Sequence, residues 1–346
     1  MRDLAKYSFA NAKIRAMLSY LIDPAQFSRL LQAKDIYEIL DLLKGTLYAE
    51  SFKTMEKEKI DLQKIEMQLL RNDLNVHRKI YNALSSQREK YFISLLIERY
   101  ELEELKVILR LWHKKVNANI EDYILDNNIK FEIDFKKIIS AQNIEEIIIL
   151  LDHTPYKAPL LSGREKFKER NSSFYLEAAL DADYYQRLIR ATDDFSSLDR
   201  KIAQKILGVE IDIENINWLV RLRKYYSLGI GEMIDLVIAG GERINKSTVR
   251  GFYVSDGLGK IIESLARGPY AKLKDLFEGN IYFLEQFLYE VLSREIRKAL
   301  AGFPFTIGIA FGYLVLKRKE TQNIISLLYA KNLGLKVEET EHLLNI

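Results

Sequence analysis

The chain has 346 residues and a formal net charge of +3 at pH 7; 48% of its residues are hydrophobic and 29% are charged. This length and composition are typical of a globular protein with two or three domains' worth of core. Because the chain has no cysteine, disulfides and thiolate metal sites are excluded, which fits a reducing cytoplasm. Its near neutrality disfavours a nucleic-acid partner, since every phosphate contact needs a cation.

Helical patterns run from one end of the chain to the other. The N-terminal residues carry charges throughout and do not predict a signal peptide. Further along, apolar residues recur every three or four positions, as in Ile36, Ile39, Leu40 and Leu43 and again in Leu102, Leu105, Ile108 and Leu109. The run nearest to a strand pattern, KFEIDF at 130–135, is short and isolated. The sequence therefore predicts an all-α fold.

The residue types that carry catalysis or bind cofactors are scattered. The basic run 164–170 is interleaved with Glu165 and Glu169, which favours a solvated helix face over a track for phosphates. Four histidines without ligand-like spacing are expected on the surface or at helix caps: His77, His113, His153 and His342. The sequence has no phosphate-binding loop, dinucleotide fingerprint or nucleophile elbow. We therefore expect a non-catalytic protein without cofactor, metal or small-molecule substrate.

The chain also repeats itself about every 110 residues. The segments 33–48, 141–156 and 255–270 end alike, at tyrosines 108 and 114 positions apart: Tyr48, Tyr156 and Tyr270. Each segment combines about three helical turns, a turn with proline or glycine, and an aromatic that packs back on the helix. Two acidic sets are each spaced by 111 and 108: Glu101, Asp212 and Glu320, and Glu66, Glu177 and Glu285. Three sets with one period predict a triplicated helical unit, with limits at 1–118, 119–228 and 229–346.

The acidic positions are a candidate constellation. We expect Glu101, Asp212 and Glu320 to begin helices, where the helix dipole stabilises a carboxylate by about 0.3–1 kcal/mol, and this explains them better than a ligand role. Glu66, Glu177 and Glu285 are expected in the middle of helices, on otherwise apolar patterns. Two interpretations of this second set stay open, because these residues could line a shared cavity or pair with arginines between units.

An uncharged stretch of eighteen residues at 299–316 meets the lower limit for a membrane-spanning helix. Gly308 and Gly312 even have the spacing of closely packed membrane helices. Pro304, however, indicates that the helix begins there, which leaves about thirteen apolar residues and about 20 Å of rise, short of a bilayer core of ~30 Å. The equivalent stretches 80–97 and 191–208 carry several charges. The segment is predicted to be a helix buried by protein.

Four stretches together resemble a known family: YSFANAKIRAMLSYLI, SSFYLEAALDADYYQRLI, DIENINWLVRLRKYY and the C-terminal run that begins GIAFGYLVLKRKETQNIISLL. They are similar to the C-type subunits of the prokaryotic V/A-type ATPases, which are related to the eukaryotic V-ATPase d subunit, and the resemblance covers essentially the whole chain. It implies a funnel of three similar units around a pseudo-threefold axis. It also implies a non-catalytic rotor adaptor, peripheral at the cytoplasmic face of the membrane, that transmits torque for ATP-coupled H⁺ or Na⁺ translocation.

The resemblance implies two partners: central-stalk subunits of the D and F type in the funnel, and the proteolipid rotor ring on the other face. Three helical units can close a ring with a central opening, which suits a helical partner. The candidates for funnel-lining, partner-binding groups are Glu66, Arg71, Glu177, Asp181, Arg187 and Glu285. The alternatives are a soluble all-helical scaffold that binds protein partners, disfavoured because solenoid repeats are shorter, and an integral membrane protein that uses 299–316.

Overall fold

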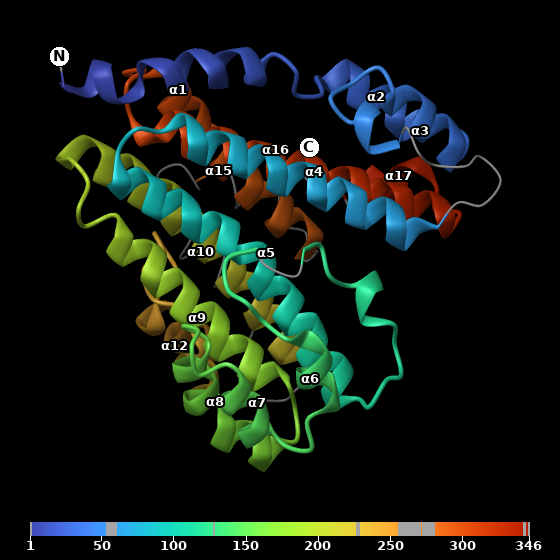
Figure 1. The fold of residues 1–346 in the computed structure, drawn as a ribbon, viewed down its shortest axis with the longest axis vertical. Coiled ribbons are helices and arrows are strands. Elements are labelled where there is room, and N and C mark those ends of the chain that lie inside the picture. Colours follow the sequence, from blue (N-terminus) through green and yellow to red (C-terminus); the bar gives the residue numbers. More distant parts are fainter. Residues whose placement is uncertain are drawn as a thin grey trace.

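The computed structural model describes residues 2–52, 61–126, 129–225, 229–254, 271, 281–341 and 344. Within these ranges the regular elements are all helices and no strand is present, which confirms the all-α prediction (Figure 1). The run at 130–134 is irregular and leads into a short helix that begins at Phe135.

Three pairs of long helices form the frame. They are α4 (Leu62–Ala83) with α5 (Gln87–His113), α9 (Phe174–Ala191) with α10 (Ser197–Tyr225), and α15 (Ile281–Ala301) with α16 (Ile307–Asn332). The second helices of the pairs begin 110 residues apart in both steps. The helix pair therefore recurs with the period found in the sequence. In Figure 1 the three short turns within the pairs gather at the upper left of the molecule.

Shorter helices precede or connect the pairs. They are α1 (Arg2–Leu18), α2 (Pro24–Gln32), α3 (Ile36–Leu43), α6 (Phe135–Ser140), α7 (Ile144–Leu150), α8 (Lys157–Arg170), α11 (Ile230–Leu236), α12 (Lys246–Val254) and α17 (Val337–Glu341), with 3₁₀ turns at Ala49–Phe52 and Ile120–Asp122. In Figure 1, α2, α3 and α17 lie together at one end, and α6, α7 and α8 lie together at another.

The second helix of each pair packs against the first helix of another pair. α5 contacts α9, α10 contacts α15, and α16 contacts α4. These contacts form a closed cycle, since the last long helix returns to the first pair. The N-terminal helix α1 strengthens this return because it packs on both α4 and α16.

The turns within the pairs are tied together by a buried carboxylate. Asp199, near the start of α10, accepts a 2.8 Å hydrogen bond from the backbone N–H of Ile307, the first residue of α16. Its other oxygen accepts a 3.0 Å bond from the hydroxyl of Tyr7 in α1. Tyr7 also reaches Glu89 of α5 at 3.3 Å. One polar cluster therefore joins α1 and the beginnings of all three second helices.

Within the described residues the hydrophobic core has two parts. The larger part extends through α1, α4 and α5 to α10, α15 and the first half of α16, with Phe92 and Phe311 packed edge to face at 5.1 Å. The smaller part lies between α2, α3, the start of α4 and the end of α16, around Ile39, Ile65 and Leu327. α4 and α16 pass from one part to the other and hold them together.

The uncharged stretch 299–316 is divided between two helices. α15 ends at Ala301 and α16 begins at Ile307, and the residues from Ile307 to Leu314 are buried. Gly308 permits a close approach of α16 to its neighbours, since an added Cβ would lie 2.7 Å from Cγ2 of Ile202 in α10 and 3.2 Å from Cβ of Ala299 in α15. Among the described residues no helix is long and apolar enough to span a bilayer. The prediction of a helix buried by protein is confirmed.

Candidate functional site: a charged face between the long helices

The first acidic set lies inside the long second helices and does not begin them. Glu101 is in the interior of α5, Asp212 in that of α10 and Glu320 in that of α16. All three are buried, with 1%, 0% and 9% of their surfaces exposed. The prediction that they occupy helix N-termini is therefore wrong. The apolar period shows which face of a helix is buried, but it does not locate the first turn.

Each of these carboxylates instead anchors a distant stretch of backbone. Glu101 accepts 2.9 Å bonds from the N–H groups of Lys130 and Phe131, and another 2.9 Å bond from the hydroxyl of Tyr156. Glu320 accepts a 2.6 Å bond from the N–H of Ile22 and a 2.9 Å bond from the hydroxyl of Tyr48. We call Glu101, Asp212 and Glu320 the carboxylate anchors.

The third anchor also accepts hydrogen bonds from backbone N–H groups. Asp212 accepts bonds from the N–H of Arg243 at 2.9 Å and of Ile244 at 2.8 Å. The third tyrosine of the repeat, Tyr270, lies outside the described residues. Burial raises the pKa of Asp212 to about 7, although the two N–H donors oppose this shift. Each anchor is thus a buried acceptor that is bonded to at least one main-chain donor.

The two described tyrosine segments also share their local hydrogen bonds. Asp35 and Asn143 cap α3 and α7, accepting from the N–H groups of Glu38 and Glu146. The carboxylates of both glutamates in turn accept a 2.8 Å bond from the backbone N–H one residue before the cap. Because each reciprocal pair satisfies two otherwise unpaired donors, the repeat is preserved at the level of individual bonds. The segment 255–270 lies outside the described residues.

The second acidic set lies near helix starts, so the prediction of mid-helix positions is wrong. Glu66 is in the second turn of α4 and Glu177 in the first turn of α9. Glu66 accepts a 2.6 Å bond from the hydroxyl of Tyr329 in α16, and Glu177 lies 3.8 Å from Arg110 of α5. Each therefore pairs with the long helix that packs on it, and Glu177 does so with an arginine. Glu285 is in α15, and its side chain lies outside the described structure.

A face of half-buried charge lies where the second helices approach one another. At its centre one small pocket of about 50 Å³ is lined by Arg99 on α5, Glu210 on α10 and Arg318 on α16. These three residues occupy equivalent positions of the repeat. Arg99 lies 3.1 Å from Glu214 and 4.0 Å from Glu210. We define the charged face as Arg99, Glu103, Lys106, Asp181, Glu210, Glu214 and Arg318.

One ammonium group forms ion pairs with two carboxylates on this face. Lys106 lies 2.9 Å from Asp181 on α9 and 3.1 Å from Glu103 on its own helix. Burial raises the pKa of Asp181 to about 7 despite Lys106. Burial also raises the pKa of Glu103, but Lys106, Arg99 and Arg318 outweigh it and lower the value to about 2. The two carboxyl groups therefore differ in affinity for a proton because they compete for one cation.

The remaining candidates from the sequence bind within the chain. Arg71 donates from Nε to the carbonyl of Leu125 at 3.0 Å, which holds the 3₁₀ region against α4. Arg187 lies 2.5 Å from Glu98 and 2.7 Å from Asp183. Asp181 belongs to the charged face, and Glu177 lies one turn before it on α9. Arg71 and Glu66 lie on α4, away from Lys106 and its partners.

The basic run 164–170 lies on a largely exposed helix face, whereas His77 is buried. The basic run 164–170 forms ion pairs with neighbouring acids, for example Lys168 with Glu145 at 2.5 Å and Arg170 with Glu232 at 2.7 Å, as expected of a solvated helix face. His77 departs from the surface prediction, because it is 3% exposed and its Nδ1 lies 3.0 Å from the carbonyl of Asp73. Burial lowers its pKa. Within the described residues no cluster of His, Asp and Glu has the geometry of a metal site.

Sequence reasoning missed the centre of the charged face. Arg99, Glu210 and Arg318 have the same spacings of 111 and 108 as the carboxylate anchors, so the repeat could have identified them. Arg99 forms ion pairs with the carboxylates of α10, and the charge of Arg318 on α16 acts on Glu103 and Glu210. This arrangement is suited to holding helices together and to contacting a polar partner surface.

Comparison with known proteins gives one consistent family. The profile of the family described as ATP synthase (C/AC39) subunit matches residues 10–343. Proteins named as the C-type subunits of A-type ATP synthases are similar along nearly the whole chain. The Methanocaldococcus jannaschii protein is 26% identical, with 99% of this chain and 87% of the relative covered. The proteins of Pyrococcus abyssi and Archaeoglobus fulgidus are 23% and 25% identical, each over 97% of this chain and over 90% and 95% of their own lengths.

Proposed function

The chain belongs to the ATP synthase (C/AC39) subunit family, and from this premise we propose that it is the adaptor that joins the central stalk of a rotary ATP synthase to the proteolipid ring in the membrane. As a member of this complex, it works in partnership with other subunits. In the proposed role it performs no catalysis itself. It is a peripheral protein at the cytoplasmic face that passes torque between ATP chemistry and H⁺ or Na⁺ translocation.

The observation that carries the proposal is the closed cycle of helix pairs. Each second helix packs on the first helix of another pair, so the three pairs support one another and no pair is a free end. A torque-bearing part must resist twisting, and a closed cycle does so better than an open stack. We propose that the cycle surrounds a pseudo-threefold axis and forms a funnel with three units, 1–118, 119–228 and 229–346.

The arrangement of the charged face supports the proposal that it is a binding surface for a polar, helical partner. Its ion pairs fix Arg99, Lys106 and Asp181 in place, and preorganised charges favour specific docking because little side-chain freedom is lost on binding. We propose that the end of the central stalk contacts this face, including Asp181 and Glu177, while Glu66, Arg71, Arg187 and Glu285 complete the funnel wall. The other end of the molecule would rest on the ring.

The test is coupling in membranes that contain the complete enzyme. Removing this chain should leave ATP hydrolysis by the soluble head largely intact and abolish ATP-driven ion uptake, and adding the purified chain back should restore uptake. Coupled uptake that survives without the chain would refute the adaptor role. Release of ATPase activity from the membrane, measured by sedimentation, would accompany the loss of coupling.

A further inference from the structure

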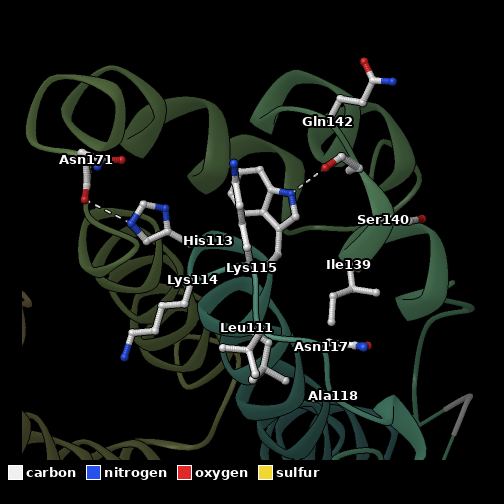
Figure 2. Close-up of a pocket in the computed structure, with 13 residues that line it drawn as sticks. Leu111, His113, Lys114, Lys115, Asn117, Ala118, Ile139, Ser140, Gln142 and Asn171 are labelled. Atoms are coloured by element: carbon white, nitrogen blue, oxygen red, sulfur yellow. Dashed lines mark hydrogen bonds between the residues drawn. The ribbon is translucent and has the colours of Figure 1, made fainter.

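A hollow of about 800 Å³ opens at the C-terminal end of α5 (Figure 2). Its floor and walls come from the last turn of α5 and the residues 114–118 that follow it, from the end of α6 and the turn to α7, and from the cap residue of α8, with Leu111 and Ile139 as apolar members. Trp112 is fixed there by a 2.7 Å bond from its indole N–H to the carbonyl of Ala141. The hollow is therefore preformed.

The charge around the hollow has one sign. Lys114 and Lys115 line it and no carboxylate does. In the described part of the chain neither lysine has an ion-pair partner, whereas the basic residues of the run 164–170 in neighbouring α8 are paired with acids. In Figure 2 the two lysine side chains extend in different directions from the end of α5. Val116, also in the lining, is 44% exposed. The hollow thus combines an apolar recess with unpaired positive charge.

The backbone at Lys115 is unfavourable for lysine. Two non-glycine residues of the described chain have positive φ, Lys115 at 52° and Asn171 at 48°, and both line this hollow. Asparagine tolerates the left-handed region, but lysine does so only with strain from its Cβ. The end of α16 has the same hydrogen bonds, from Leu335 N–H to the carbonyl of Ala330 as from Val116 to Leu111, and it has Gly334 at the equivalent position, with φ of 69°.

From these observations we propose that the hollow is a docking site for an acidic segment of another subunit of the ATP synthase, which inserts an apolar side chain against Trp112 and Leu111. A glycine would adopt this backbone conformation without strain. In the proposed site a lysine stands there instead because its ammonium group contacts the acidic segment. An anionic lipid surface fits less well, since lipid-binding patches gather four to eight cations on an exposed face, and this site has two lysines around a recess. The inference rests on membership of the complex and not on the adaptor role.

A purely structural explanation makes a different prediction. Cations near a helix C-terminus interact favourably with the helix dipole, which would account for both lysines without a partner. In that case Lys115→Gly would relieve the strain and leave assembly unchanged. In the proposed case the same variant would raise the melting temperature of the free chain by roughly 1–3 °C and still weaken assembly. Stability and assembly would move in opposite directions.

The first experiment measures assembly with the whole complex. Membranes stripped of this chain are titrated with purified wild-type chain, with the double variant Lys114→Gln/Lys115→Gly, and with Lys201→Gln, an exposed lysine on α10, as control. The double variant should rebind roughly three- to tenfold more weakly at low salt, with the difference shrinking at high salt as exposed charges are screened. Equal rebinding of all three proteins would overturn the proposal.

The second experiment identifies the partner. Because the chain has no cysteine, Val116→Cys provides a single thiol for a photo-crosslinker, and Leu333→Cys provides a control at the equivalent end of α16, where the exposed fraction is 71%. In the intact complex, irradiation should join position 116 to a peptide of another subunit that is rich in Asp and Glu. Adducts with lipid alone, no intersubunit product, or a peptide without acidic residues would each contradict the proposal.

A lipid source of negative charge is tested directly. Vesicles of an anionic phospholipid and vesicles of a zwitterionic one are incubated with the free chain and with the double variant. Equal binding of both proteins to anionic vesicles supports a protein partner, and loss of vesicle binding in the double variant overturns it. The adaptor role can fail independently, because coupled ion uptake without the chain would refute that role even if the cross-link at position 116 were found.

Discussion

The hydroxyl of Tyr48 donates a 2.9 Å hydrogen bond to the carboxylate of Glu320, which joins the first fifty residues of the chain to its last long helix. The same relationship exists between Tyr156 and Glu101, but there the tyrosine follows its acid along the chain. The repeating element is therefore a long helix plus the segment that follows it. For the last helix that segment is supplied by the N-terminus, so the two ends of the chain complete one another.

The first prediction concerns this junction. Glu320→Gln should destabilise the chain by about 3–5 kcal/mol, because it leaves a buried ammonium without its counter-charge. The ammonium belongs to Lys317, which is 0% exposed, lies 2.9 Å from Glu320 and sits over the ring of Tyr48 at 3.8 Å. Urea unfolding of the purified chain measures the effect.

The control for that change removes the cation as well. Lys317→Met/Glu320→Gln should recover a large part of the lost stability, because no uncompensated charge remains. The exposed Glu338→Gln serves as a neutral reference. A double variant as unstable as Glu320→Gln would show that the hydrogen bonds to Ile22 and Tyr48, and not the ion pair, dominate the site.

The sequence contains the period of these anchors but not their partners. Spacings of 111 and 108 make Glu101, Asp212 and Glu320 equivalent, and the tyrosines recur at 48 and 156. Equivalence alone does not say which tyrosine meets which acid. The pairing of Tyr48 with Glu320 arises from closure of the whole chain, and the donors at Ile22 and Lys130 are backbone groups, which leave no residue signature.

The all-helical structure and the burial of the apolar residues from Ile307 to Leu314 could be predicted from the periodicity and charge of the sequence. The residues at which helices begin could not be predicted in this way. Glu177, for example, was expected in the middle of a helix and lies in the first turn of α9. The charged face was also missed, although Arg99, Glu210 and Arg318 carry the repeat spacing. Charged residues on a helix usually indicate a solvent-exposed face. Here they form a half-buried cluster because three helices pack close together.

The second prediction concerns the close packing of α16. Gly308→Val should destabilise the chain by about 1–3 kcal/mol, since its Cβ would meet Ile202 and Ala299 at 2.7 and 3.2 Å. Gly231→Ala in α11, where an added Cβ meets nothing within 4 Å, should be neutral or gain up to about 1 kcal/mol. Thermal unfolding distinguishes the two, and an equal effect of both would contradict the packing explanation.

The third prediction concerns pH. Glu104 is 4% exposed, and burial raises its pKa from 4.5 to about 8, with the N–H of Leu125 only partly compensating at 2.5 Å. The folded chain therefore holds a proton that the unfolded chain releases above pH 4.5, so this group's contribution to stability is present at low pH and is lost as pH rises toward about 8.

Glu104→Gln mimics the protonated form. It should leave stability at pH 5 nearly unchanged and make the chain about 1–3 kcal/mol more stable than wild type at pH 9. Urea unfolding across this range is the measurement. Asp212 and Asp181, whose pKa values burial raises to about 7, should maintain a weaker slope in the variant. A variant with the same pH profile as wild type would show that Glu104 is ionised throughout.

The fourth prediction concerns the charged face. Arg99→Gln should destabilise the free chain by about 2–4 kcal/mol, because Glu210 and Glu214 would face each other one turn apart on α10 without their shared cation. The additional change Glu214→Gln should recover part of the loss, giving a coupling of about 1–3 kcal/mol in a double-mutant cycle measured by urea unfolding. Arg29→Gln, an exposed arginine on α2, should change little.

A functional role of the charged face requires a second effect in the complete enzyme. Arg99→Gln/Glu214→Gln should lower ion uptake per ATP hydrolysed more than the same loss of stability does when Gly308→Val causes it. Ion pairs that only hold helices together affect coupling solely through stability, whereas charges that contact the stalk affect it directly. Equal coupling in the two variants would therefore leave Arg99 with a purely structural role.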